Sequence, residues 1–490
     1  MTQSGERAFL LSLRVCVAAF FVFILSRTWA DPDLWGHLLF GRDIFQAGHL
    51  PSSDPYSFTA DKAWVNHEWL AEVLMYLAYA SAGSFGLIAL KTALLLGAAA
   101  AVLAALRSAA LSPPMHDLMV FLFVAGTFGR AHAFRPQVFS IMLFALLLLT
   151  LRAAERGHMY RLWLVPLIFA FWVNLHGGWL VGFGVFGIWT ALKLFFGKKE
   201  NSGSGVVIGA GATTVIATLA NPNGWRLWEF LSATVGLRRE AVADWQPLWT
   251  LSPLALLPWI MCAAITLFTI YKRRSWINPR FAAIVCMCGA GSILVSRLDA
   301  FFVVATLMLL GPAVAPQTVP TGEAAGRSIA LIAGIALSTM VFVAMNPRFS
   351  CVQIDSNGQP EPEVVRFVKE RGLHGRMLTF FDWGEYAIWH MAPEIVVSMD
   401  GRRETIYSER VIADHLKVYR NDPTADKIVE ALNPDYVWLP AKSGVLTRLE
   451  ASGWTRVFSG PVSTVLARSS AATGPVVIAD PPGPRCFPGP

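Results

Sequence analysis

The chain has 490 residues, of which 54% are hydrophobic and 15% are charged. Soluble domains contain about 25% charged residues, so these values exclude a soluble globular enzyme, a disordered chain and a fibrous protein. They indicate a membrane protein with many spans. The net charge of +7 does not indicate nucleic-acid binding, because the basic residues form short clusters between apolar runs, where they set the orientation in the membrane.

Charged residues are distributed unevenly along the chain. Residues 351–470 hold 14 basic and 16 acidic side chains, whereas the much longer segment 1–350 holds only 41 charged side chains. We therefore predict a membrane domain over residues 1–350, which includes an extracytoplasmic loop over residues 31–68. A water-soluble domain is predicted over residues 351–470, and the Pro/Gly-rich residues 471–490 are predicted to form a disordered tail.

The membrane domain is predicted to contain roughly eleven transmembrane helices. The first apolar run, residues 9–30, is long enough to span, and Trp29 does not fit the small-residue pattern of a signal-peptide cleavage site. The other runs lie at about 84–106, 116–131, 137–151, 160–177, 179–196, 205–220, 250–271, 279–296, 299–315 and 327–345.

The run 69–82 decides the predicted topology. It contains Glu72, and we expect it to lie along the membrane surface, because the basic clusters that follow the later spans then share a side with the N-terminus. Positive charge favours the cytoplasmic side. The N-terminus is therefore predicted to be cytoplasmic, and the loop 31–68, the loop 221–249 and the domain 351–470 to face the periplasm or the exterior.

The soluble domain is predicted to be a small α/β unit. The apolar patterns predict helices over 363–372 and 425–432, and strands over 376–381, 394–398, 436–439, 454–458 and 463–467. The six cysteines show neither a disulfide framework nor the spacing of a zinc site, so we expect inert packing residues. They are Cys16, Cys262, Cys286, Cys288, Cys351 and Cys486.

The loop 31–68 carries many acids, histidines and aromatic residues. Asp33 and His37 are four residues apart and share a face of a predicted helix, and Asp31 precedes that helix. A carboxylate pair beside a membrane suits general-base chemistry, or a divalent metal held against phosphate oxygens. The alternative is an amphipathic surface helix with an aromatic belt, in which one Asp is only a helix cap.

Three polar sets are predicted to lie near the same membrane face as this loop. Ionisable groups at such a depth are costly and therefore indicate a functional site. Arg135 and Arg297 can bind phosphate, and the glycines after His176 allow close backbone approach. For Arg297 the alternative is anchoring at the membrane interface. The candidate residues of these sets are Arg135, Gln137, Asn174, His176 and Arg297. A substrate with a lipid tail and a phosphate head suits such residues.

These motifs resemble those of GT-C glycosyltransferases, membrane enzymes with an acidic motif directly after the first span. They are most similar to a group of uncharacterised bacterial GT-C-like proteins, and the resemblance covers nearly the whole chain. One departure is Gly36, where that group often has a second aromatic residue. The matching segments are Asp31–Gly41, Asp54–Thr59, His67–Glu72, Arg135–Gln137, Asn174–Gly178, Trp383–Trp389 and Asp400–Arg402.

The resemblance implies transfer of a sugar from a polyprenyl-phosphate donor to a lipid, glycan or protein acceptor. The reaction would occur at the outer face of the bacterial cytoplasmic membrane, among its lipids. Asp31 or Asp33 would be the catalytic base of an inverting transfer, with a slight preference for Asp31 because it directly follows the span. Arg42, Arg135 or Arg297 would neutralise the leaving phosphate.

The other loop residues have weaker implied roles. His37, His67 and Glu68 would line the sugar site, with Asp54 beside them. If a divalent cation such as Mg²⁺ or Mn²⁺ takes part, Asp31, Asp33 and His37 would hold it. The sequence does not decide whether one does.

Two other functions remain open. One is a transporter or flippase of a lipid-linked sugar, and the other is a non-catalytic partner in envelope assembly. The soluble domain also has two interpretations. Asp400, Arg402 and Arg403 either reach back to the membrane site, or they form an ion pair in a buried structural core.

Overall fold

In a computed structural model of the chain, the described residues are 3–51, 53–107, 111–196, 203–237, 239, 242–314, 324–356, 358–468 and 475–490. They belong to two compact units. Unit 1 comprises residues 1–28 and 85–350, and unit 2 comprises residues 29–84 and 351–490. The first loop thus groups with the C-terminal region, whereas the sequence-based division placed it in the membrane domain.

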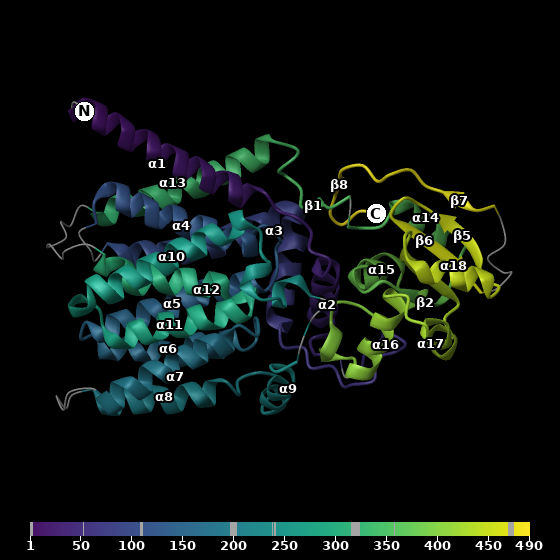
Figure 1. Ribbon diagram of the computed structural model, residues 1–490, viewed down its shortest axis with the longest axis horizontal. Helices are drawn as coiled ribbons and strands as arrows, with labels where there is room; N and C mark the ends of the chain where they lie inside the picture. Colours follow the sequence, from purple (N-terminus) through teal and green to yellow (C-terminus); the bar gives the residue numbers. More distant parts are fainter. Residues whose placement is uncertain are drawn as a thin grey trace. The chain divides into compact units, whose positions relative to one another are not determined.

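Unit 1 is a set of apolar helices packed side by side (Figure 1). A helix lies within every apolar run of the sequence. Five helices are long and apolar enough to cross a membrane among the described residues, so the chain is a helical membrane protein. The helices are α1 (Gln3–Ser26), the C-terminal part of α3 (Trp69–Leu106), α4 (Pro113–Ala131), α5 (Gln137–Glu155), α6 (Leu164–Trp172), α7 (Trp179–Phe196), α8 (Ser204–Ala217), α9 (Arg226–Thr234), α10 (Pro253–Lys272), α11 (Pro279–Leu294), α12 (Asp299–Ala305) and α13 (Ala324–Met345).

Helix α3 is two helices joined at a kink. Ala82 and Gly83 have non-helical backbone angles, and Gly83 has a φ of +57°, which glycine adopts without steric cost. The segment before the kink belongs to unit 2 and the segment after it belongs to unit 1. The predicted surface helix 69–82 therefore ends where the backbone breaks. Its position on the membrane surface stays a prediction.

Unit 2 is built on a six-stranded mixed sheet with the strand order β3-β2-β4-β6-β5-β7. Strand β2 is parallel to β3 and β4, whereas β6 is antiparallel to β4 and β5. Strands β2 to β6 lie within two residues of the predicted ranges. The strands are β2 (Gly375–Thr379), β3 (Ile395–Val397), β4 (Tyr436–Pro440), β5 (Thr455–Ser459), β6 (Ser463–Ala467) and β7 (Val477–Ile478).

Helices cover this sheet. The core includes Leu378 of β2, Val437 of β4 and Leu466 of β6, packed with apolar residues of α16, α17 and α18. Helix α2 of the first loop packs against α15. The helices of unit 2 are α2 (Leu34–Ala47), the N-terminal part of α3, α14 (Pro362–Glu370), α15 (Gly384–Met391), α16 (Glu409–Tyr419), α17 (Ala425–Leu432) and α18 (Gly444–Ala451).

Two predictions about the C-terminal end are wrong. The predicted disordered tail is ordered over residues 475–490, whereas residues 471–474 lie outside the described part. Strand β8 (Arg485–Cys486) pairs with β1 (Gln353–Ile354). Trp35 also donates a hydrogen bond to the carbonyl of Pro488 at 2.8 Å. Cys351 and Cys486 form a disulfide across a sequence separation of 135 residues. They are therefore not inert packing residues.

We expect the disulfide to fasten the C-terminal segment. Replacing both cysteines by serine should destabilise unit 2 by about 2–4 kcal/mol, because the closed loop is long. The measurement is the rate of limited proteolysis of the full-length protein in detergent. The matched control is Cys286→Ser, which removes an exposed free thiol and should not change the rate. Equal rates for the double variant and the wild type would contradict this role.

Candidate active site

The two predicted catalytic carboxylates occupy different environments at the start of α2. Asp31 is 2% exposed, and its Oδ1 accepts the backbone N–H of Asp33 at 3.1 Å. Asp33 directly precedes α2 but makes no capping hydrogen bond with its side chain, which is only half-buried. The carboxylate of Asp31 therefore shapes the turn, whereas Asp33 is the more exposed of the two acids.

His37, one turn into α2, pairs with an acid of the N-terminal part of α3. Its Nδ1 lies 3.3 Å from Oε1 of Glu72, whose Oε2 accepts a hydrogen bond from the amide of Asn66 at 2.6 Å. Burial lowers the pKa of His37, but the hydrogen bond and charge of Glu72, with the charges of Glu68 and Asp33, raise it to about 9. His37 is therefore cationic at neutral pH.

Glu385 of α15 reaches the same turn from the C-terminal region. Its Oε2 accepts the backbone N–H of Gly36 at 3.1 Å, and a Cβ added at Gly36 would overlap this carboxyl group. A Cβ added at Gly401 would overlap Asp33 and touch Glu385. The carboxyl groups of Asp33 and Glu385 therefore both lie against Gly401, and the missing side chain of Gly36 makes room for Glu385.

The environments of these two acids differ. Glu385 is 3% exposed, and burial, with the charges of Asp33 and Asp400, raises its pKa well above the ordinary value. Asp33 is half-buried. Carboxyl groups that are close together favour the neutral form of the more buried one, which here is Glu385.

A buried arginine connects the first loop to the C-terminal region. Arg402 forms a two-pronged ion pair with Asp400, through bonds of 2.9 and 2.7 Å, and a third bond of 2.6 Å with Asp54. Its guanidinium lies 4.7 Å from the ring centroid of Phe40 and 4.8 Å from that of Trp64. Arg402 thus joins a structural ion pair to the aromatic residues of the loop. Asp54 belongs to this network and is 2% exposed at its side chain.

We expect Arg402 to be essential for the stability of unit 2. Arg402→Leu should destabilise the protein by about 3–5 kcal/mol, because it leaves Asp54 and Asp400 buried without their cation. Arg402→Lys should recover part of this loss, since a lysine keeps the charge but not the fork geometry. The measurement is thermal unfolding of the full chain in detergent. Arg410→Leu, at a side chain 91% exposed, is the control and should change little. An unchanged melting temperature for Arg402→Leu would contradict this role.

The remaining loop candidates lie in unit 2 but outside the turn at Asp33. Arg42 donates to Asp43 at 2.9 Å and lies 6.0 Å from the ring centroid of Trp389. His67 lies 3.5 Å from Glu68, and the backbone N–H of Glu68 bonds to Asn66. Glu68 also contributes to the negative field at His37. These residues belong to the first loop and stay candidates for sugar binding.

The proposed metal ligands do not fit a metal site. Among the residues that the structure describes, no group of three or more His, Cys, Asp or Glu side chains is arranged to hold a metal ion. His37 is engaged with Glu72 and favours its protonated form, whereas a metal ligand must be neutral. We therefore derive no step through a metal held by Asp31, Asp33 and His37.

Unit 1 has its own polar cluster where α4 ends and α12 begins. Arg130 bonds to Asp244 at 2.6 Å, to Asp299 at 3.1 Å and to the carbonyl of Ser296 at 2.8 Å. Asp244 also accepts a bond of 2.7 Å from Arg135. Burial raises the pKa of Asp244, but the charges of Arg130, Arg135 and Arg297 outweigh it and lower the value. Arg135 is thus positioned by Asp244.

A second part of this cluster contains His176 and Arg297. Nδ1 of His176 accepts the backbone N–H of Gly178 at 3.0 Å and lies 2.8 Å from Oγ of Ser140. The same Oγ accepts the indole N–H of Trp172 at 2.7 Å. Nε2 of the same ring lies 3.2 Å from Nη2 of Arg297, which can only donate, so the two side chains are hydrogen-bonding neighbours. A guanidinium beside an imidazole is suited to an anionic acceptor.

The last two candidate residues of unit 1, Gln137 and Asn174, donate hydrogen bonds to backbone carbonyls. Gln137, the first residue of α5, donates to the carbonyl of Arg297 at 3.3 Å. The amide of Asn174 donates to the carbonyls of Ala170 and Ala220, both at 2.8 Å. Gln137 therefore positions Arg297, and Asn174 joins the end of α6 to the segment after α8. Their predicted direct binding of substrate stays untested.

Sequence reasoning did not identify two central acids. Glu385 lies between Trp383 and Tyr386, and an acid between aromatic residues is a signal of a buried polar role. Asp244 lies in the loop 221–249, without a motif around it, and only the folded structure brings it to Arg130 and Arg135.

No protein-family model and no curated protein matches this chain. Solved structures do. The oligosaccharyltransferase of Archaeoglobus fulgidus aligns at a TM-score of 0.55 with 11% identity, over 94% of this chain and 74% of the other. ArnT from Cupriavidus metallidurans, solved with undecaprenyl phosphate bound, aligns at 0.51 with 12% identity, over 97% and 100%. The chain shares the membrane fold of these structures. At this level of identity the likeness covers the fold and not the activity.

Proposed function

We propose that this protein is a membrane glycosyltransferase. It moves a sugar from a polyprenyl-phosphate-linked donor to a lipid, glycan or protein acceptor of the bacterial cell envelope, at the outer face of the cytoplasmic membrane. The observation that carries the proposal is the contact of 3.2 Å between Arg297 and His176, which places a guanidinium beside an imidazole. Such a pair suits the phosphate of a lipid-linked donor, whose charge grows as the sugar leaves.

The fold gives independent support. ArnT from Cupriavidus metallidurans has been solved with undecaprenyl phosphate, and AglB from Archaeoglobus fulgidus with a dolichol-phosphate and an inhibitory peptide. The AglB structure aligns with this chain at a TM-score of 0.52 and 12% identity, over 89% of this chain and 70% of the other. Both ligands are lipid phosphates. A lipid phosphate as the donor carrier of this chain is consistent with that fold.

In unit 2, Asp33 is the proposed general base. Its carboxylate takes the proton from the acceptor hydroxyl as the acceptor oxygen bonds to the anomeric carbon of the sugar. The bond between this carbon and the phosphate oxygen breaks on the opposite side, so the configuration inverts, and polyprenyl phosphate leaves with the bonding electrons. Asp33 is preferred over Asp31 because the carboxylate of Asp31 is buried and bonded to the adjacent backbone.

The disulfide supports the proposed orientation. Disulfides form and persist in the periplasm and outside cells, and they are rare in the cytosol. Cys351 and Cys486 both belong to unit 2, which also contains the first loop. This favours an extracytoplasmic unit 2 and a cytoplasmic N-terminus.

A structure determined with undecaprenyl phosphate tests the phosphate role. We expect the phosphate within hydrogen-bond distance of Arg297 and His176, and the same preparation of Arg297→Gln should show no lipid there. Lipid phosphate bound at another place in both proteins would contradict the proposed role of this pair. Transport of lipid-linked sugar remains the alternative, and it predicts lipid movement between leaflets without release of polyprenyl phosphate.

A further inference from the structure

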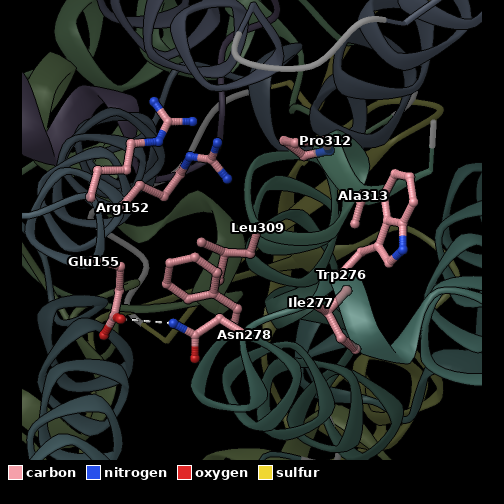
Figure 2. A pocket seen from close by; sticks show the side chains of 10 residues that line it. Arg152, Glu155, Trp276, Ile277, Asn278, Leu309, Pro312 and Ala313 are labelled. Atoms are coloured by element: carbon pink, nitrogen blue, oxygen red, sulfur yellow. Dashed lines mark hydrogen bonds between the residues drawn. The ribbon is translucent and has the colours of Figure 1, made fainter. Parts of the chain in front are cut away.

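A cavity of about 200 Å³ lies in unit 1, and Figure 2 shows the side chains that line it. Its wall includes the C-terminal end of α5 with Arg152 and Arg156, and the turn before α11 with Trp276 and Asn278. The segment 309–313, which follows α12, completes it. Nothing in the proposed glycosyl transfer uses this cavity.

The cavity and the His176–Arg297 pair lie at opposite ends of the same helix. Gln137, which bonds to the backbone of Arg297, begins α5, and the cavity adjoins the last turn of α5. The 19 residues of α5 extend over about 28 Å, close to the ~30 Å thickness of the hydrocarbon core. The cavity is therefore about one helix length away from the His176–Arg297 pair and is a separate site.

Arg152 is held inside the protein rather than directed to water. It is 5% exposed and donates to the backbone carbonyls of Met308 and Ala105. Met308 lies in a π-helical turn, Thr306–Leu310, which interrupts the regular helical hydrogen bonding. An arginine near the end of a span ordinarily extends to the interface, so its retention at a cavity wall is a sign of a binding role.

The charge of the cavity wall favours an anion. Glu155 is its only acidic lining residue among those described, and it is engaged by Arg280 at 2.7 Å and Lys193 at 3.6 Å. Its carboxylate also accepts a bond of 2.8 Å from the amide of Asn278, drawn as a dashed line in Figure 2. The two arginines of the wall therefore contribute positive charge that Glu155 does not neutralise.

We propose that this cavity binds the phosphate group of a small anionic ligand, either the headgroup of a phospholipid or free phosphate. Its volume is below the roughly 300–1,000 Å³ of ordinary small-molecule pockets, so one phosphate-bearing headgroup is the largest ligand that it suits. Arg156, an exposed residue that caps α5, supplies the accessible charge, and Arg152 supplies the buried one.

Lipid binding to the full-length protein tests this site. Wild type, Arg156→Gln and the control Arg161→Gln would be placed in phosphatidylcholine nanodiscs with increasing phosphatidylglycerol, and bound lipid measured by native mass spectrometry. Arg161 is exposed and does not line the cavity. We expect Arg156→Gln to weaken phosphatidylglycerol binding about 5- to 10-fold and Arg161→Gln less than about 2-fold, since Arg156 lines the cavity and Arg161 does not.

The outcomes distinguish free phosphate from a lipid headgroup as the ligand, and one outcome would overturn the proposal. Competition by inorganic phosphate, with the same dependence on Arg156, would establish a site for free phosphate. No competition, with loss in Arg156→Gln alone, would establish a lipid headgroup site. Equal weakening in both variants, or no weakening in either, would show that only the general positive charge of this face attracts lipid and would overturn the proposal. Undecaprenyl-phosphate binding at Arg297 is measured separately and does not depend on this result.

Discussion

Asp33→Asn is expected to lower the turnover number for glycosyl transfer by about 10³-fold, because an amide cannot accept the proton of the acceptor hydroxyl. The melting temperature should change little, since the side chain is half-buried and asparagine has nearly the same size and shape. The measurement is the initial rate of polyprenyl-phosphate release at saturating donor, together with thermal unfolding of the same preparation.

Asp31→Asn is the matched control for this prediction. The asparagine keeps an oxygen at the position that accepts the backbone N–H of Asp33, so the turn should persist and turnover should fall less than about 10-fold. A large loss in Asp31→Asn with near-normal turnover in Asp33→Asn would assign the base to Asp31 instead. Normal turnover in both variants would leave no catalytic role for either carboxylate.

Arg297→Gln is expected to lower kcat/KM for the lipid-linked donor by about 10²- to 10³-fold, because it removes a donor to the leaving phosphate. Binding of undecaprenyl phosphate should weaken in parallel. The control is Arg226→Gln, an exposed arginine at the start of α9, in the predicted loop that also contains Asp244. Equal effects of the two changes would mean that general charge rather than the His176–Arg297 pair attracts the donor.

These two variants also separate the competing functions. A transporter of lipid-linked sugar should lose flux in Arg297→Gln but keep it in Asp33→Asn, because moving a lipid requires no proton acceptor at the sugar. A non-catalytic assembly partner should tolerate both changes. Only a transferase should lose sugar transfer in both variants while remaining folded.

The helices and strands were predictable because their patterns are local. An apolar run that can span a bilayer has few other stable structures, and β-branched runs such as Ile395–Val397 and the aromatic run at Tyr436–Leu439 favour strands. The strands around these runs are β3 and β4. The exact number of spans remains a prediction, since five helices meet the length and composition required among those described.

The contacts of unit 2 between residues far apart in the sequence were not predictable in the same way. Glu385 meets Gly36 across 349 residues, and Arg402 meets Asp54 across 348 residues. The disulfide joins Cys351 to Cys486 although no spacing rule relates them. A sequence pattern shows which residues are costly to bury. It does not show which distant residue offsets the free-energy cost of their burial.

The most direct test of the proposed function is a turnover assay with a panel of polyprenyl-phosphate sugars. Wild type, Asp33→Asn and Arg297→Gln would be purified in detergent and supplied with each donor and with envelope lipid, glycan and peptide acceptors, and released polyprenyl phosphate would be measured. We expect one donor to be consumed by the wild type and by neither variant. Consumption of no donor by the wild type, or consumption that both variants retain, would contradict a glycosyltransferase with this site.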